Sequence, residues 1–192
     1  MHTEVTPAMV AEAKPDAVIV ATGSNPLVLP IPGINDTGVI HAGDLLDGKA
    51  SVGKKVLVVG GGMVGCEVAD FLGELGHEVS VIELRDQLGP DVIPEHRKFL
   101  MKDFEAYKVQ GVTGAKVAQF FLDGVSYTLA DGTEGRLEGF DNVVLAMGYR
   151  NNDTISEEIK KIVAETYVIG DAVKARKALD ATAEGLNTAL EI

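Results

Sequence analysis

The chain has 192 residues, 46% of them hydrophobic, and a formal net charge of −12. This length suits one large domain or a domain with part of another, and the acidic balance argues against nucleic acid or an anionic membrane as a partner. The sequence contains no apolar run of about 18 residues and no signal peptide, so we expect a cytoplasmic protein that does not enter a membrane.

The first part of the chain predicts short elements joined by turns. Residues 8–13 read as a helix, and the apolar run within 16–21 reads as a buried strand. The proline-rich connector 26–32 cannot form a regular helix or a central strand. Residues 38–46 then predict another short helix.

A glycine motif is the most informative feature of the chain. The run Val56-Leu-Val-Val-Gly-Gly-Gly-Met-Val-Gly-Cys-Glu67 reads as a buried strand, a turn and the start of a helix, and Gly60, Gly62 and Gly65 fit G-x-G-x-x-G. The first glycine permits the tight turn, the second lets the backbone approach a pyrophosphate, and the third lets the helix lie close to the strand. The free N–H groups at the helix N-terminus then donate hydrogen bonds to phosphates, and the positive end of the helix dipole attracts them.

The context of this motif is the one that dinucleotide binding requires. A helix from about 63 to 75, a stop at Gly76, and a second strand over 78–82 with a terminal acid follow in order. A glycine-rich turn without a ligand is the alternative.

The acid that ends the second strand indicates which cofactor is bound. Glu83 lies 18 residues after Gly65, where a carboxylate accepts hydrogen bonds from the adenosine ribose hydroxyls and repels a 2′-phosphate. We therefore expect NADH rather than NADPH. Arg85 could instead reach a 2′-phosphate, although a solvated surface arginine is the plainer interpretation.

Cys66 is the single cysteine, so an internal disulfide and a C-x-x-C metal site are excluded. It falls on the first turn of the glycine-loop helix, where a thiol of lowered pKa is conceivable. A small residue chosen for packing is the interpretation that we favour. The sequence offers no metal-ligand spacing, no Ser-Tyr-Lys set and no catalytic His–acid pair, so we assign no catalytic residue.

The second half of the chain predicts a helix, a meander and two further strands. Turn signals at Asp123-Gly124 and Asp131-Gly132 separate three short strands that read as a β-meander. The expected elements are the helix 94–107, the meander strands 117–122, 126–129 and 136–138, the buried strands 142–147 and 167–169, and a closing helix over 180–190.

A sequence pattern that occurs twice indicates how these elements are divided between domains. Thr3-Glu-Val-Thr6 precedes a strand that ends in Ala21-Thr-Gly23, and Ala115-Lys-Val-Ala118 precedes one that ends in Ala146-Met-Gly148. The second pair belongs to the unit that starts at Gly60, whereas the first pair has no glycine loop ahead of it. We interpret the chain as a complete dinucleotide domain within the back half of another one, unless the two strands are similar by chance.

These residues resemble the FAD-dependent pyridine nucleotide oxidoreductase family over nearly the whole chain. The resemblance rests on Lys14-Pro-Asp-Ala-Val-Ile-Val-Ala-Thr-Gly-Ser24, the glycine run and Val168-Ile-Gly-Asp171. It is closest to the C-terminal portion of NADH:flavin oxidoreductases of the 2-enoate reductase and 2,4-dienoyl-CoA reductase type. It implies an α/β fold: a Rossmann-like three-layer (β/β/α) NADH domain, residues 35–149, inserted into the C-terminal part of an incomplete FAD-type domain, residues 1–34 and 150–192.

The resemblance also implies the residues of two cofactor sites. Glu67 would lie near the nicotinamide, unless it is simply an acid favoured at a helix start. The implied NADH residues are Gly60, Gly62, Met63, Val64, Gly65, Glu67, Glu83, Leu84, Arg85, Val117, Ala146, Met147 and Gly148. The implied FAD half-site is Val5, Ala21, Thr22, Gly23, Gly170 and Asp171.

The partners that the resemblance implies lie outside this sequence. It contains no FAD glycine loop and no barrel with FMN and iron–sulfur cysteines, so we expect a fragment that does not retain FAD, is inactive alone and self-associates through an apolar edge. The full enzyme would pass hydride from NADH to FAD, and electrons on to a barrel domain or subunit that reduces an enoate or dienoyl-CoA. A non-catalytic NAD(H)-binding, sensing or interaction subunit is the alternative.

Overall fold

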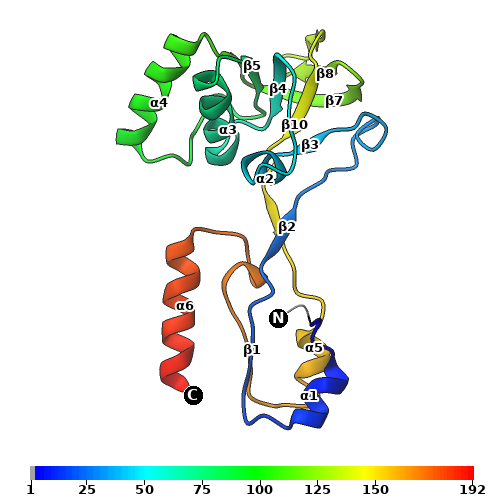
Figure 1. The fold of residues 1–192 in the computed structure, drawn as a ribbon, viewed down its shortest axis with the longest axis vertical. Helices are drawn as coiled ribbons and strands as arrows, with labels where there is room; N and C mark the ends of the chain where they lie inside the picture. Colours follow the sequence, from blue (N-terminus) through cyan, green and yellow to red (C-terminus); the bar gives the residue numbers. More distant parts are fainter. Residues whose placement is uncertain (1–2) are drawn as a thin grey trace. The chain divides into compact units, whose positions relative to one another are not determined.

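The computed structural model describes residues 3–192, which form two compact units (Figure 1). One unit is Val28–Gly148, and the other combines the residues up to Leu27 with Tyr149–Ile192. The sequence places these divisions after residues 34 and 149.

A parallel sheet forms the centre of the Val28–Gly148 unit. Its strands follow the order β3-β10-β4-β5-β6, and every pairing is parallel. The sequence predicts the three central strands but neither β3 nor β6, because two or three residues at a sheet edge show no apolar period. The bounds are Ile40–His41 (β3), Lys55–Val59 (β4), Glu78–Ile82 (β5), Gln110–Val112 (β6) and Asn142–Leu145 (β10).

Helices cover one face of this sheet and an antiparallel meander covers the other (Figure 1). In β4, Val56 and Val58 pack among the helices while Leu57 and Val59 pack against the meander, because successive strand side chains point to opposite faces. The α/β fold class predicted from the sequence is confirmed. The elements are α2 (Ala42–Leu46), α3 (Met63–Glu74), α4 (Pro94–Tyr107), β7 (Ala115–Phe121), β8 (Gly124–Leu129) and β9 (Glu134–Leu137).

The order of the strands reverses at β4. From β4 the chain moves outward through β5 to β6, and after the meander it returns to β10 on the other side of β4. In open parallel sheets, ligands bind beyond the carboxyl ends of the strands at such a switch point. A site is therefore expected among the residues that follow β4, β5 and β10.

The smaller unit contains two two-stranded sheets. The strand β1 (Val18–Val20) pairs in parallel with β12 (Thr166–Val168), and β2 (Ser24–Pro26) pairs antiparallel with β11 (Tyr149–Asn151). The other elements are α1 (Pro7–Ala13), α5 (Ser156–Ile159), α6 (Ala178–Glu191) and a 3₁₀ turn over Gly170–Ala172.

The prediction that β1 is a buried strand is wrong for one of its faces. Ile19 is 43% exposed, whereas Val20 lies in a small core with Val10, Ile159 and Val163. Within residues 3–192 this sheet has two strands, and the described core lies on the Val20 side.

Helix α6 carries exposed apolar side chains at Leu179, Leu186 and Leu190. Its other side packs against the 3₁₀ turn. In the part of the chain that the structure describes, no helix is both long and apolar enough to cross a membrane.

Candidate functional site

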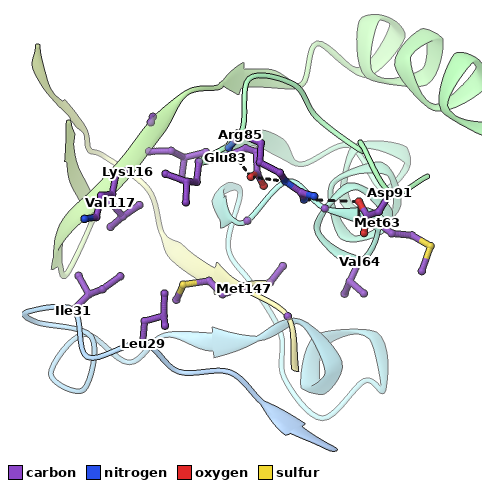
Figure 2. A pocket seen from close by; sticks show the side chains of 17 residues that line it. Leu29, Ile31, Met63, Val64, Glu83, Arg85, Asp91, Lys116, Val117 and Met147 are labelled. Atoms are coloured by element: carbon purple, nitrogen blue, oxygen red, sulfur yellow. Dashed lines mark hydrogen bonds and ion pairs between the residues drawn. The ribbon is translucent and has the colours of Figure 1, made fainter. Parts of the chain in front are cut away.

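A cavity of about 540 Å³ lies in the Val28–Gly148 unit, beyond the carboxyl ends of β4, β5 and β10 (Figure 2). This size is typical of small-molecule sites. The residues expected to bind NADH all line it except Gly65 and Glu67. The cavity therefore lies at the switch point of the sheet.

The glycine loop between β4 and α3 forms the floor of the cavity. Gly60 has φ of +105°, and a Cβ there would overlap the carbonyl oxygen of Ala146. A Cβ on Gly65 would overlap the carbonyl oxygen of Gly60, so this glycine lets α3 lie against β4. These two positions require glycine because of backbone packing.

Gly62 differs from the other two motif glycines. Its φ of −72° is open to any residue, and a Cβ there would meet only the side chains of Arg85, at 3.1 Å, and Asp91, at 3.4 Å. It lines the cavity as the N-cap of α3 and offers no side chain to cap that helix. The bare backbone at this position is where the glycine motif predicts a pyrophosphate.

Glu83 is a buried carboxylate that ties the end of β5 to the glycine loop. It is 6% exposed. Its Oε2 accepts a hydrogen bond from the Gly61 N–H, and its Oε1 accepts from Arg85 N at 2.8 Å and Arg85 Nε at 3.1 Å. These bonds fix a negative charge at the cavity wall, at the position where a ribose is expected.

Arg85 bridges two acids at the wall of the cavity (Figure 2). Its guanidinium pairs with Glu83 at 3.1 Å and lies 3.8 Å from Asp91 Oδ1. Asp91 Oδ1 in turn accepts a hydrogen bond from the N–H of Met63, the first residue of α3, at 3.0 Å. Arg85 is therefore a cavity-wall residue paired with two acids, and its side chain is still 48% exposed.

The far side of the cavity is apolar, and sequence reasoning missed part of it. Leu29 and Ile31 come from the proline-rich connector, which is held to the meander by the Phe120 N–H donating to Pro32 O at 2.8 Å. Figure 2 shows both side chains near Met147 and away from the charged group. Further wall residues absent from the sequence prediction are Ile82, Asp91, Ala115 and Lys116.

Two residues on α3 lie outside the cavity. Glu67 is exposed on the helix. Cys66 is fully buried, with Sγ 3.4 Å from Gly61 O, and burial is the largest cause that raises the pKa of its thiol to about 11. The thiol is protonated at neutral pH, which favours a packing role over a reactive one.

In the smaller unit, the residues after β1 are hydrogen bonded to residues that follow β12 and β11. Ser24 Oγ donates to Asp171 Oδ2 at 3.1 Å, and the Thr22 hydroxyl donates to the backbone oxygen of Asn152. Gly170 and Asp171 follow β12, as Ala21, Thr22 and Gly23 follow β1, so the parallel pairing of these strands brings the two groups to one edge. Val5 is exposed and makes none of these bonds.

Comparisons with known proteins agree with this architecture. Residues 4–184 match the pyridine nucleotide-disulphide oxidoreductase family, which confirms the resemblance drawn from the motifs. An NADH oxidase of Thermoanaerobacter brockii is 36% identical over 193 residues, 95% of this chain and 29% of the relative. A metal reductase of Desulforamulus reducens is 30% identical, over 99% of this chain and 33% of the relative.

A solved structure shows the same fold along the whole chain. The complex of 2-naphthoyl-CoA reductase with 2-naphthoyl-CoA superposes with a TM-score of 0.89 at 30% identity, over 100% of this chain and 29% of that chain. The present chain thus spans about a third of the length of the relatives it matches.

Proposed function

Since this chain belongs to the pyridine nucleotide-disulphide oxidoreductase family, we propose that its Val28–Gly148 unit is the NADH-binding module of a flavin-dependent oxidoreductase. The observation that supports this most strongly is the convergence of three features on one cavity: the bare backbone of Gly62, the N-terminus of α3 and the buried carboxylate of Glu83. A dinucleotide presents a pyrophosphate and a ribose that suit these groups.

The residues present fit the proposed cofactor. Gly62 and the first N–H groups of α3 would hold the pyrophosphate, Glu83 would accept from the adenosine ribose, and Ala146 to Gly148 would flank the nicotinamide. Bound NADH supplies a hydride, which in the complete enzyme would go to FAD. The protein itself orients the cofactor and excludes water from the apolar wall.

We extend the proposal to the smaller unit and to the longer protein. The hydrogen-bonded loops at Thr22–Ser24 and Gly170–Asp171 would contribute to an FAD-type domain into which the NADH unit is inserted. The greater length of the relatives supports further domains in the complete enzyme. The partner that we propose is a barrel with FMN and an iron–sulfur cluster, which reduces an activated alkene. A cytoplasmic setting belongs to the same proposal.

We propose NADH rather than NADPH because the charges at the ribose position are already fixed. Glu83 is held by the Gly61 N–H and by Arg85, so its carboxylate cannot turn away from a 2′-phosphate without breaking these bonds. Arg85 is shared between two acids, which reduces its attraction for a further anion.

Calorimetric titration of both cofactors tests this preference. We expect NADH to bind at least about tenfold more tightly than NADPH, the factor that one charged hydrogen bond supplies. Tighter binding of NADPH would show that Arg85, not Glu83, sets the choice.

A further inference from the structure

The start of α3 is covered by a carboxylate of the protein itself. Asp91 Oδ1 accepts from the Met63 N–H at 3.0 Å. A Cβ on Gly62 would lie 3.4 and 3.5 Å from the two carboxylate oxygens, so both oxygens lie over the bare backbone of the glycine loop. This is the position that the proposed function gives to the pyrophosphate.

The backbone before Asp91 is fixed by two hydrogen bonds, and the Val92 N–H closes the turn around Asp91 by donating to Gly89 O at 3.2 Å. The Gly89 N–H donates to Gly61 O at 2.7 Å, and Arg97 Nε donates to Leu88 O at 2.7 Å. The Asp91 side chain, in contrast, is 49% exposed. The carboxylate can therefore leave the helix start by rotation of its side chain into water, without movement of the loop.

A carboxylate at this position has the chemistry of the ligand that it would exclude. The N-terminus of α3 attracts an anion, and Gly62 provides no side-chain cap, so Asp91 supplies the missing acceptor. Arg85 adds a cation 3.8 Å away. A second anion at the same N–H would meet the negative charge of Asp91 at close range.

We propose that Asp91 is a specificity-determining residue: it is an internal anion that competes with the pyrophosphate for the start of α3 and turns aside when a dinucleotide binds. This inference rests on the proposed function of the cavity. When Asp91 turns aside, Arg85 loses one of its two acidic partners and becomes available to the pyrophosphate. The competing carboxylate therefore lowers the affinity for any ligand that places a pyrophosphate at the start of α3, and it leaves nucleosides, which carry no pyrophosphate, unaffected.

The test compares Asp91→Asn with Asp86→Asn in the full chain. Asp91→Asn keeps an oxygen that can accept from Met63 but removes the competing charge. Asp86→Asn removes the same charge from an exposed position of the same loop, which does not line the cavity. NADH, inorganic pyrophosphate and adenosine are titrated into each variant by calorimetry, and the Met63 amide is followed by NMR.

We expect Asp91→Asn to bind NADH and pyrophosphate about three- to tenfold more tightly than the wild type, the range of a charge at a helix terminus. Adenosine binding should not change, Asp86→Asn should match the wild type, and the Met63 amide should shift when pyrophosphate is added. This pattern supports the inference.

Other outcomes separate the inference from the proposed function. Unchanged or weaker NADH binding in Asp91→Asn, beside clear binding by the wild type, overturns the role of Asp91 and leaves the NADH site intact. Equal tightening of adenosine also overturns it, since the variant would then have altered the pocket in general. If no variant binds NADH while Asp91→Asn still tightens pyrophosphate, the NADH proposal fails and the competition for the anion stands. If neither ligand binds, both are overturned.

Discussion

Gly65 is the motif glycine on which the fold depends most directly. A methyl group there would overlap the carbonyl oxygen of Gly60, and that backbone cannot move without separating α3 from β4. We expect Gly65→Ala to lower the free energy of unfolding by about 3 kcal/mol or more, measured by urea denaturation.

Gly185→Ala is the matched control for this substitution. Gly185 lies within α6, and the nearest atom to an added Cβ is Ile169 Cδ1 at 3.9 Å. Alanine is the better helix former, so this variant should gain about 0.5 kcal/mol. Equal stability of Gly65→Ala and Gly185→Ala would contradict the claim that Gly65 is required for the close packing of α3 on β4.

At single positions, sequence reasoning finds the residues that carry a motif and misses those brought in by tertiary contacts. Gly60, Gly62 and Glu83 follow from spacing along one βαβ unit. Asp91 and Leu29 have no such signal, because each reaches the cavity from a loop fixed by contacts with distant backbone. Only the fold shows that the helix start already has an acidic partner.

An aspartate between α3 and α4 destabilises the fold when it is ionised. Asp70 Oδ1 is buried and, among the described residues, has no hydrogen-bond partner. Burial, followed by the nearby carboxylates of Asp103 and Glu74, raises the pKa of Asp70. The folded protein therefore binds this proton more tightly than the unfolded chain does. Stability falls as pH rises from the ordinary aspartate pKa through the raised value, and the full loss is present above it.

Asp70→Asn should remove the loss of stability that ionised Asp70 causes. At neutral pH we expect a gain in unfolding free energy of about 0.5 kcal/mol, the size of a like-charge pair on a helix, and the gain should disappear below the ordinary pKa of an aspartate. Urea denaturation across this pH range measures it, with Glu105→Gln, an exposed acid on α4, as the control. A gain of the same size at every pH would show that charge is not the cause.

Among the elements, those with a long pattern and a boundary signal are predicted best. Helix α4 begins at Pro94 and ends at Tyr107, as its amphipathic pattern and first-turn proline predict. The strands β3, β6 and β11 were not predicted, since each has two or three residues and forms only because a neighbouring strand is there to pair with. Their existence depends on the sheet rather than on local sequence.

At the scale of the whole molecule, we expect the 192-residue chain to be purified without flavin. The described residues contain one strand–glycine–helix unit of the dinucleotide type, and the Asp171 carboxylate already accepts from Ser24 and from Arg176 N. A hydride from NADH would then have no acceptor held within reach. Absorbance after mixing with FAD and gel filtration measures retention, and one FAD per chain would contradict this expectation.

NADH binding over Gly62 is measured most directly by calorimetric titration of NADH into the wild-type chain and Gly62→Ala. The backbone at Gly62 accepts alanine, and the nearest obstacle is the flexible end of Arg85, so both proteins should unfold at nearly the same temperature. We expect the added methyl group, in the space of the pyrophosphate, to weaken NADH binding at least about tenfold. Equal affinities, or a folded wild type that binds no NADH, would contradict the proposed site.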